Sequence, residues 1–426
     1  MMKRIRMNLR VLSAMLAGSV FLAGYSASAG AMAHLADPAN NSPARVEGGF
    51  IKGMDVSMIP DIEALGGKYY QNGQQKDPIA IMKQHGVNYI RMRLWVDPKS
   101  LNGEAYGGGN VTLHEAIEMG KRAHHYGMKY LLDIHYSDFW TDPGKQLKPK
   151  GWENLDFEQL VAKVGTYTDA VMKAHRRAGV MPDMVQVGNE LNSGMLWPEG
   201  KNWGGDGHEF DRLAALLKSG IHAVKSAYHP GEKVQIMLHL AEAGNNGLFR
   251  WWFDEITKRQ VDFDIIGMSY YPFWHGPMAD VKANIADVID RYQKPVIIAE
   301  TSYAYTDKNG DSLGNSFSGE SAVEGYPVSV TGQATYLKDI MSLVHDAPQN
   351  MGIGVFYWGG EWIPVQGATW ATDSGMEYIN DHGSTGNSWD NQALFDFSGH
   401  VLPSMDVFRT HFFKHDKSKS DDSENK

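Results

Sequence analysis

The sequence predicts an α/β protein of the (β/α)8 class, a TIM barrel. Eight short apolar runs alternate with segments of helical spacing, each run is bounded by Gly, Pro or polar residues, and polar side chains gather after several runs. Runs that are apolar on both faces are typical of buried parallel strands. Their regular alternation with helices indicates a closed barrel. An open doubly wound sheet is the competing arrangement, but no G-x-G-x-x-G pattern follows the first run.

The predicted strands and helices follow one another along most of the chain. The strands, in order, are Phe50–Asp55, Asn88–Leu94, Lys129–His135, Met184–Gly188, Lys233–His239, Asp264–Ser269, Pro295–Ala299 and Gly352–Trp358. Two helical stripes are the clearest, Phe157, Leu160, Val161, Val164, Val171 and Ala174, then Leu213, Leu217, Ile221 and Val224. The longest non-helical segments, 136–155, 301–331 and 359–402, follow the third, seventh and eighth strands. They should therefore lie at the carboxyl face of the barrel, where barrel enzymes keep their active sites.

The chain ends differ from this pattern. Residues 1–29 resemble a secretory signal peptide, with basic residues before the apolar run Val11–Gly24 and a small-residue site at Ser26–Ala29. The apolar run has about 14 residues, whereas a bilayer span needs about 20, so we expect no membrane anchor. We expect a linker at 30–47, one (β/α)8 catalytic domain at 48–414 and a disordered polar tail at 415–426. The location would be secreted or periplasmic.

Composition excludes several classes of function. The formal net charge is −10, and a nucleic-acid partner would favour a basic face. The absence of cysteine excludes disulfides and thiol chemistry. The 12 Trp and 19 Tyr offer flat faces that suit stacking on sugar rings, although most aromatic residues pack in cores. We expect a monomer. The 17 His form no H-E-x-x-H pattern, so the sequence does not indicate a zinc site.

Two carboxylates end predicted strands. Glu190 follows the fourth strand and Glu300 follows the seventh. A carboxylate directly after an apolar strand costs free energy unless it is paired or functional, and a single one is most simply an ion pair or a helix cap. Strands three apart in a ring of eight, however, face each other across the barrel mouth. The pair therefore predicts glycoside hydrolysis, in which two carboxyl groups flank the scissile bond.

Other polar and aromatic residues lie at the same predicted face. Arg91 and Arg93 end the second strand, and a guanidinium near Glu300 would keep that carboxylate ionised. We assign this role to Arg93. The alternative is a structural salt bridge within the barrel, and the two roles are compatible. Asn189 would hydrogen-bond a sugar 2-hydroxyl. Tyr270 would orient the nucleophile. The remaining predicted substrate contacts are His135, Asp138, Trp358 and Asn387.

Four ordered motifs make the sequence similar to a known family. They are Gly53-Met-Asp-Val-Ser57, Tyr89-Ile-Arg-Met-Arg-Leu-Trp95, Gln186-Val-Gly-Asn-Glu-Leu-Asn192 with Gly194 and Trp197, and Glu300-Thr-Ser-Tyr303. The chain resembles the arabinogalactan endo-β-1,4-galactanases of glycoside hydrolase family fifty-three, from about Phe50 to Phe413. The resemblance implies a retaining barrel enzyme with Glu190 as acid/base and Glu300 as nucleophile. Its substrate would be β-1,4-galactan.

A loop after Glu300 alternates oxygen-bearing residues with glycines. Its spacing suits Ca²⁺ and equally suits a solvated turn, and no downstream Glu has EF-hand spacing. Bacterial members of the resembling family bind calcium in this loop. The resemblance implies a structural Ca²⁺ with side-chain ligands from Asn309, Asp311, Asn315 and Asp390 and the carbonyl of Leu313. Asn309 stands where Asp is more usual, which would lower the affinity.

The sequence leaves two alternatives to a galactanase. One is another endo-glycanase of the same clan, a β-mannanase or an endoglucanase, because the barrel and the carboxylate pair are shared. The other is a non-catalytic carbohydrate-binding barrel, which the presence of both Glu190 and Glu300 disfavours.

Overall fold

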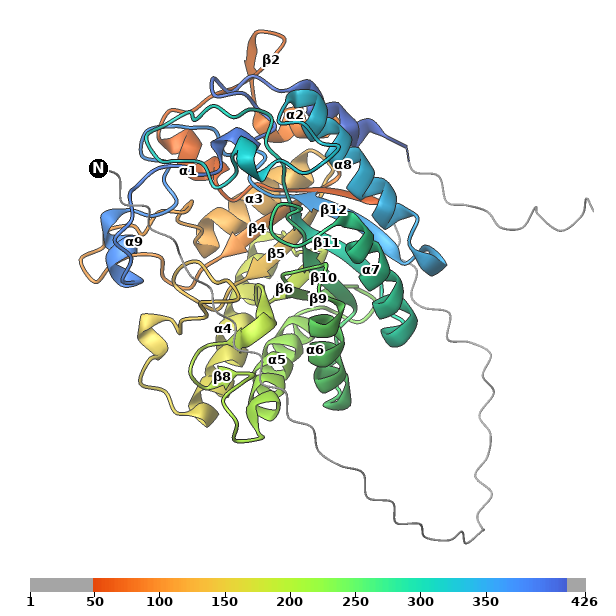
Figure 1. Cartoon of the computed structure of the whole chain (residues 1–426). Helices are drawn as coiled ribbons and strands as arrows, with labels where there is room; N and C mark the ends of the chain where they lie inside the picture. The colour runs from red at the N-terminus through yellow and green to blue at the C-terminus, as the bar shows by residue number, and fades with distance from the viewer. Residues whose placement is uncertain (1–48, 412–426) are drawn as a thin grey trace, which may run out of the picture. The chain divides into compact units, whose positions relative to one another are not determined.

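The structure, a computed structural model, describes residues 49–411. The predicted signal peptide, linker and polar tail lie outside the described residues, as do residues 48 and 412–414 of the predicted domain. Within the described part, the strands occupy the centre and the helices surround them (Figure 1). This arrangement confirms the predicted TIM barrel.

Eight parallel strands close the barrel in the order β1-β12-β11-β10-β9-β6-β5-β4. Their bounds are β1 Ile51–Asp55, β4 Tyr89–Leu94, β5 Lys129–Ile134, β6 Met184–Val187, β9 Gln235–Leu240, β10 Ile265–Ser269, β11 Val296–Thr301 and β12 Gly352–Tyr357. Each matches a predicted strand, with ends that differ by at most two residues. Two short antiparallel hairpins lie outside the barrel, β2 Tyr69–Gln71 with β3 Gln74–Lys76, and β7 Gly194–Met195 with β8 Gly200–Lys201.

Helices lie between successive barrel strands, and α9 follows the last strand. They are α1 Ile59–Ala64, α2 Pro78–Gln84, α3 Leu113–His125, α4 Phe157–Ala178, α5 Glu209–Ser226, α6 Asn246–Lys258, α7 Met278–Tyr292, α8 Val330–His345 and α9 Asp373–Tyr378. Local signals set the ends of α4. Asp156 forms a capping box with Gln159, and the left-handed Gly179 ends the helix. The predicted stripe of α4 is buried at Leu160, Val164 and Val171.

Alternation along each strand separates two cores. Inward-facing residues fill the barrel interior, and they include Ile51, Tyr89, Leu131, Met184, Met237, Ile265, Ile297, Ala299, Ile353 and Phe356. A much larger core lies between the strands and the helices. Gly53 on β1 has no Cβ, and one there would lie 2.1 Å from the Phe356 ring. The glycine therefore makes room for Phe356 in the barrel interior. Toward the carboxyl ends of the strands, beyond these apolar residues, the inward-facing side chains are polar.

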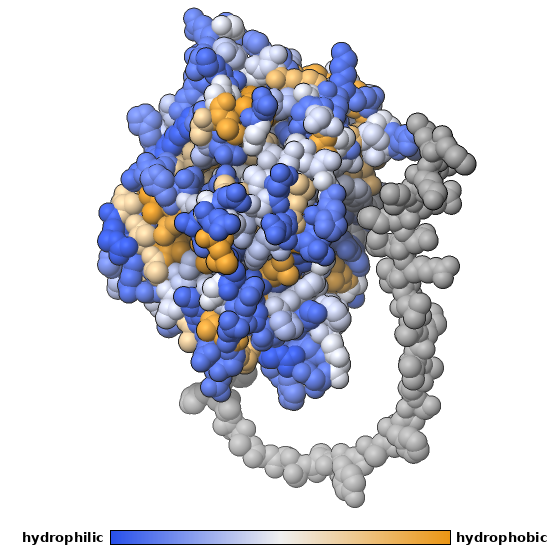
Figure 2. All heavy atoms as spheres, turned by 90° about the vertical axis from the view of Figure 1, so that its left-hand side faces the viewer, coloured by the Kyte–Doolittle hydropathy of each residue, from blue (hydrophilic) through white to orange (hydrophobic). Residues whose placement is uncertain are grey.

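The surface is mixed in character. On the face in Figure 2, hydrophobic residues form separate patches among hydrophilic ones. Within 49–411, no helix combines the length and the apolar character that a membrane span requires.

Candidate active site

A cleft of about 460 Å³ lies among residues from the loops after the barrel strands. It is lined by two carboxylates, by basic and amide side chains, and by aromatic rings. Its lining includes Arg93, His135, Trp140, Asp142, Asn189, Glu190, Tyr271, Trp274, Glu300, Trp358 and Trp389. A concave site that combines aromatic walls with a few polar groups suits a ligand with both flat apolar faces and hydroxyls.

Glu190 and Glu300 both reach this cleft from opposite parts of the barrel. Glu190 follows β6 and Glu300 belongs to β11, with β9 and β10 between them in the ring. The exposed fraction is 9% for Glu190 and 7% for Glu300. Two nearly buried carboxyls therefore face one cavity, as the strand positions predicted.

Arg91 organises the polar floor below the cleft. Its guanidinium donates to Asp55 at 2.9 Å and to Asp133 at 2.7 Å, and it lies 2.8 Å from Oε1 of Glu300. It also donates to Asn189 at 3.0 Å. Since Arg91 is wholly buried, this cation acts on its anions with little solvent screening.

The guanidinium that contacts Glu300 thus belongs to Arg91, whereas we expected Arg93. Both side chains point inward on β4, but Arg93 lies one pleat nearer the mouth. Its guanidinium carbon lies 4.1 Å from the centroid of the Trp140 ring, and its Nε lies 3.8 Å from Asp55. Arg93 therefore forms part of the cleft wall and does not contact Glu300.

Tyr271 contacts the other oxygen of Glu300. Its hydroxyl donates to Oε2 at 2.9 Å. The prediction that Tyr270 performs this role is wrong, because the Tyr270 hydroxyl donates to the Gly276 carbonyl at 2.9 Å. Side chains alternate along β10 and its continuation, so Tyr271 faces inward with Ile265 and Ser269, and Tyr270 faces outward.

Glu190 has a different set of partners. Its Oε1 accepts a hydrogen bond from the Ser269 hydroxyl at 2.7 Å. Its backbone is left-handed, with φ 47°, a conformation that costs free energy for a residue with a Cβ. The Gln146 amide nitrogen stabilises this turn, because it donates to the carbonyls of Asn189 and Glu190 at 2.8 and 3.1 Å.

These environments separate the two carboxyls electrostatically. Burial raises the pKa of Glu190 well above its ordinary value, and the nearby charge of Glu300 raises it further. Burial also raises the pKa of Glu300, but Arg91 at 2.8 Å opposes that shift. Of the pair, Glu190 is therefore the one that holds a proton, and Glu300 is the one that ionises.

Three further predicted residues lie at the cleft. Asn189 lines it while its amide nitrogen donates to the Thr141 carbonyl at 2.9 Å. His135 is held between Asp133 at 3.0 Å and the Thr141 hydroxyl at 2.9 Å. Trp358 packs edge-to-face on Trp389, with ring centroids 4.7 Å apart. All three have positions fixed by neighbours before any ligand binds.

Two predicted contacts lie elsewhere. The Asp138 carboxylate accepts from the backbone N–H groups of Asp97 and Lys150 at 2.9 and 2.8 Å, so it ties two loops together. The Asn387 amide donates to the Trp362 carbonyl and accepts from the Trp389 N–H, at 2.8 and 2.9 Å. Neither residue lines the cleft. The predicted substrate contacts of Asp138 and Asn387 are therefore replaced by structural roles.

The predicted calcium loop folds against the loop that carries Asp390. Asp311 accepts from the backbone N–H groups of Leu313 and Asn387 at 2.8 and 2.6 Å. Asp390 accepts from the Gly310 N–H at 2.9 Å. Two acceptor oxygens here, Oδ1 of Asn315 and Oδ1 of Asp390, are buried without a hydrogen-bond partner among the described residues. The oxygen atoms of these residues would therefore suit a cation that takes oxygen ligands.

Burial raises the pKa of Asp390 to about 7, and the charge of Asp311 contributes to the shift. The described part of the chain contains no group of three or more His, Cys, Asp or Glu placed to hold a metal. The predicted set does not depend on such a group, because most of its ligands are amide and carbonyl oxygens.

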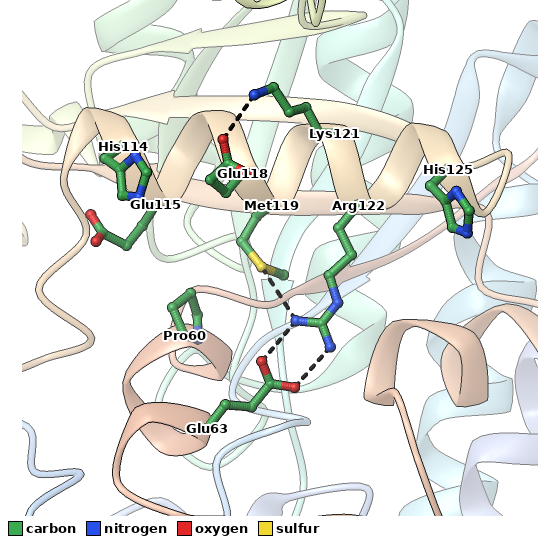
Figure 3. A pocket seen from close by; sticks show the side chains of 9 residues that line it. All are labelled: Pro60, Glu63, His114, Glu115, Glu118, Met119, Lys121, Arg122 and His125. Carbon is green, nitrogen blue, oxygen red and sulfur yellow. Dashed lines mark hydrogen bonds and ion pairs between the residues drawn. The ribbon is translucent and has the colours of Figure 1, made fainter.

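A second recess of about 500 Å³ lies on the outside of the barrel, between α1 and α3 (Figure 3). Four of its charged side chains form two ion pairs. Arg122 binds Glu63 at 2.7 Å, and Lys121 binds Glu118 at 2.8 Å. The described residues that line this recess include no Trp, Tyr or Phe, whereas the cleft at the barrel mouth has aromatic walls, so the cleft remains the candidate active site.

Comparison with known proteins assigns the chain to a family. The pattern of Glycosyl hydrolase family 53 matches residues 51–408. The chain belongs to this family. An endo-beta-1,4-galactanase of Bacillus subtilis (strain 168) is 39% identical over 379 residues, which cover 84% of this chain and 85% of the relative. An arabinogalactan endo-beta-1,4-galactanase of Cellvibrio japonicus (strain Ueda107) is 34% identical over 388 residues, 88% of this chain and 93% of the relative.

Solved structures agree with this assignment. The GH53 catalytic domain of Ignisphaera aggregans superposes with a TM-score of 0.79 at 40% identity, over 86% of this chain and 98% of that domain. One of two fungal beta-1,4-galactanases superposes with a TM-score of 0.68 at 29% identity, over 84% and 98%. The family 53 chain is thus a glycoside hydrolase on a TIM barrel, and its substrate is a carbohydrate polymer.

Several residues of this family 53 site did not emerge from the sequence. Tyr271 and Ser269 could have been found by continuing the alternation of the sixth barrel strand. Gln146, Asp142 and Trp140 lie in the long segment 136–155, whose path has no periodic signal. Their positions depend on tertiary contacts, such as the bond from Gln146 to the Glu190 turn.

Proposed function

We propose that this family 53 hydrolase cleaves internal β-1,4-galactosidic linkages of galactan and of type I arabinogalactan, the side chains of plant pectin, with retention of configuration. The observation that carries the proposal is the pair of carboxyls in one aromatic cleft. The Arg91 guanidinium binds Glu300, whereas the neutral Ser269 hydroxyl binds Glu190. The relatives named endo-beta-1,4-galactanase and arabinogalactan endo-beta-1,4-galactanase support the substrate.

In the first step, Glu300 attacks the anomeric carbon and Glu190 gives its proton to the leaving glycosidic oxygen. Arg91 and Tyr271 hold both oxygens of Glu300, which keeps the carboxylate ionised and aimed. Burial without a cation partner keeps the proton on Glu190 at rest. The product is a covalent glycosyl-enzyme.

In the second step, Glu190 is ionised and accepts a proton from water as the water attacks the same carbon. The bond to Glu300 breaks, and its carboxylate returns to the contacts with Arg91 and Tyr271. Two inversions at one carbon give net retention. Both steps therefore use one residue as acid and then as base.

The walls of the cleft suit a galactan chain. Trp358 offers a ring face, and Asn189, Arg93 and His135 offer polar groups beside the two carboxyls. The Asn189 oxygen is occupied by Arg91 and one amide N–H by the Thr141 carbonyl, so the second amide N–H remains to bind a sugar hydroxyl next to the reacting carbon. We propose these four side chains as substrate contacts.

We also propose that a structural Ca²⁺ binds Asn309, Asp311, Asn315, Asp390 and the carbonyl of Leu313. The two unpartnered oxygens and the raised pKa of Asp390 support it, because a cation would satisfy both oxygens and offset the charge of Asp311. The ion would connect the loops after β11 and β12 beside the cleft. No step of the reaction depends on it.

We propose that the protein is exported and acts as a secreted or periplasmic monomer without a membrane anchor. The support is the basic, apolar and small-residue pattern of residues 1–29. A plant polysaccharide substrate is consistent with action outside the cell.

The decisive experiment compares polysaccharides. Purified protein should release reducing sugar from unsubstituted β-1,4-galactan and not from β-mannan or β-glucan, and NMR should show that the first product is the β-anomer. Turnover on mannan or glucan alone would favour the other endo-glycanases of the clan. Binding without turnover on any polymer would favour a non-catalytic barrel. An initial α-anomer would remove the retaining mechanism.

A further inference from the structure

Three buried side chains form a series of hydrogen bonds that ends at the carboxyl of Glu190. Gln186 on β6, His239 on β9 and Ser269 on β10 form what we call the hydrogen-bond chain. Nε2 of Gln186 lies 3.0 Å from Nδ1 of His239, and Nε2 of His239 lies 2.8 Å from Oγ of Ser269. Ser269 in turn lies 2.7 Å from Oε1 of Glu190. Gln186, His239 and Ser269 have no exposed surface, so solvent does not compete for these bonds.

The direction of the hydrogen-bond chain is set at the Gln186 end. Arg91 can only donate, and its Nε lies 3.2 Å from Oε1 of Gln186. This contact identifies the oxygen of the Gln186 amide. Its NH₂ nitrogen therefore faces Nδ1 of His239, and also the Gly188 carbonyl and Oδ1 of Asn189, both at 3.1 Å, and it offers Nδ1 no acceptor. The backbone N–H of Glu190, a second obligate donor, also points at Nδ1 of His239, at 3.4 Å.

His239 is therefore an acceptor at Nδ1, and its ring proton is on Nε2. The alternative tautomer would donate from Nδ1 to Oδ1 of Asn189, 3.1 Å away, but it would bring that N–H against two other donors. The Asn189 oxygen is already satisfied by Arg91 at 3.0 Å and Gln186 at 3.1 Å. Burial and the charge of Arg91 lower the pKa of His239 well below its ordinary value, so the ring is neutral.

Because Nε2 of His239 donates to Ser269, the Ser269 hydroxyl must use its own hydrogen on Oε1 of Glu190. A protonated Glu190 then has only Oε2 on which to carry its proton. We propose that the hydrogen-bond chain confines the acid proton of Glu190 to Oε2, which makes His239 and Ser269 positioning residues of the acid/base. The opposite polarity would put the proton on Oε1, between Glu190 and Ser269, and away from the substrate.

The sheet places Ser269 where this is possible. The pairing of β10 with β11 shifts register between Met268 and Ser269, so Ser269 lies opposite Glu300 and not opposite Ala299. Such an irregularity re-aims the side chains that follow it. Ser269 and Tyr271 then each donate to a different carboxyl of the pair, Ser269 to Glu190 and Tyr271 to Glu300.

The proposal rests on the proposed role of Glu190, and the test separates the two. The variants are Ser269→Ala and His239→Leu, with His239→Gln as the conservative variant. Its amide N–H can donate to Ser269 while its oxygen accepts. Ser219→Ala is the matched control, because the Ser219 hydroxyl donates to the Val161 carbonyl between α4 and α5, outside the barrel. Folding is checked by circular dichroism and melting temperature.

The measurement is kcat/KM against pH, on galactan and on an aryl β-1,4-galactobioside whose leaving group departs without a proton. Ser269→Ala and His239→Leu should lose about 10–100-fold on galactan, a part of the roughly 100- to 10,000-fold that a general acid contributes, and much less on the aryl substrate. The basic limb, which reports Glu190, should move to higher pH in Ser269→Ala because a donor to its carboxylate is lost. It should move in the same direction in His239→Leu because the Ser269 hydroxyl, without the His239 donor, is no longer committed to donating to Glu190. His239→Gln should recover most of the activity on galactan and the position of the limb.

Other charged groups also act on Glu190, namely Glu300, Arg91 and Asp142, and the titratable Tyr271 lies close by. None of them is altered in these variants, so a shifted limb reports the hydrogen-bond chain. If the limb stays at its wild-type position, or if both substrates lose activity equally, the proposal is overturned while the galactanase function stands. Should His239→Leu not fold, Ser269→Ala decides alone. A wild-type protein inactive on galactan would instead overturn the proposed function.

Discussion

Tyr271 donates its hydroxyl to Oε2 of Glu300 at 2.9 Å, while Arg91 holds Oε1 of the same carboxylate at 2.8 Å. Both oxygens are thus bound, and the carboxylate cannot rotate without breaking a bond. Among residues 49–411, Glu190 has only the neutral Ser269 as a side-chain partner. This difference in partners, more than the burial that the two share, distinguishes a nucleophile from an acid.

The Tyr271→Phe variant should lose about 10–100-fold in kcat, because a hydrogen bond to a charged group contributes about 1.5–3 kcal/mol. The acid limb of the pH profile should move to higher pH, since Glu300 loses a donor that favours its ionised form. Tyr270→Phe is the control from the next position, and it should change neither quantity because the Tyr270 hydroxyl bonds Gly276. An equal effect of the two variants would contradict the assignment.

Removal of each carboxyl should have a distinct chemical signature. Glu300→Ala should abolish turnover, and azide should restore it as a glycosyl azide of configuration opposite to that of the substrate. Glu190→Ala should spare the first step for substrates with good leaving groups, which need no proton. Product analysis by NMR identifies the azide. Near-normal activity of both variants on galactan would show that other residues perform the reaction.

Chelation should lower the melting temperature by a few degrees in a reversible way. An ion that binds only the folded state adds about 2.7 kcal/mol at a hundredfold excess over Kd, which is a modest shift for a chain of this size. Asp311→Ala should abolish the sensitivity, whereas Asp307→Ala in the same loop should retain it. Activity at low temperature should largely survive chelation. A melting curve of calcium-saturated wild type that does not respond to chelator would exclude the site.

Stability should fall as the pH drops below about 6.5, in part through His175 on α4. Burial lowers its pKa from 6.5 to about 4, so the folded state favours the neutral ring. The contribution is present above pH 6.5 and is lost as the pH falls through 4, because the unfolded state binds the proton first. The full difference is about 3 kcal/mol. Urea titrations should show a weaker pH dependence for His175→Gln, and an unchanged one for the exposed His114→Gln.

The barrel strands could be predicted because their signal is local. Ile297 and Ile298 on β11 are both buried, one inside the barrel and one against the helices, so the strand is a continuous apolar run. Its polar end at Glu300 then marks the mouth. The prediction that Arg93 supports Glu300 was wrong for a related reason. Alternation places Arg91 and Arg93 on one face, but only the depth of each pleat in the closed barrel decides which one reaches Glu300.

The sequence by itself determined the fold, the family and the fact that Glu190 and Glu300 stand at the ends of barrel strands. Periodicity and strand ends are properties of consecutive residues, so they can be read without the tertiary structure. Tertiary structure alone decided which neighbours these carboxyls meet. Tyr271, Ser269 and His239 come from other strands than Glu190, and the donor–acceptor direction of their bonds depends on Arg91 from yet another. Protonation follows burial and the nearest charges, and both arise only when distant segments close the barrel.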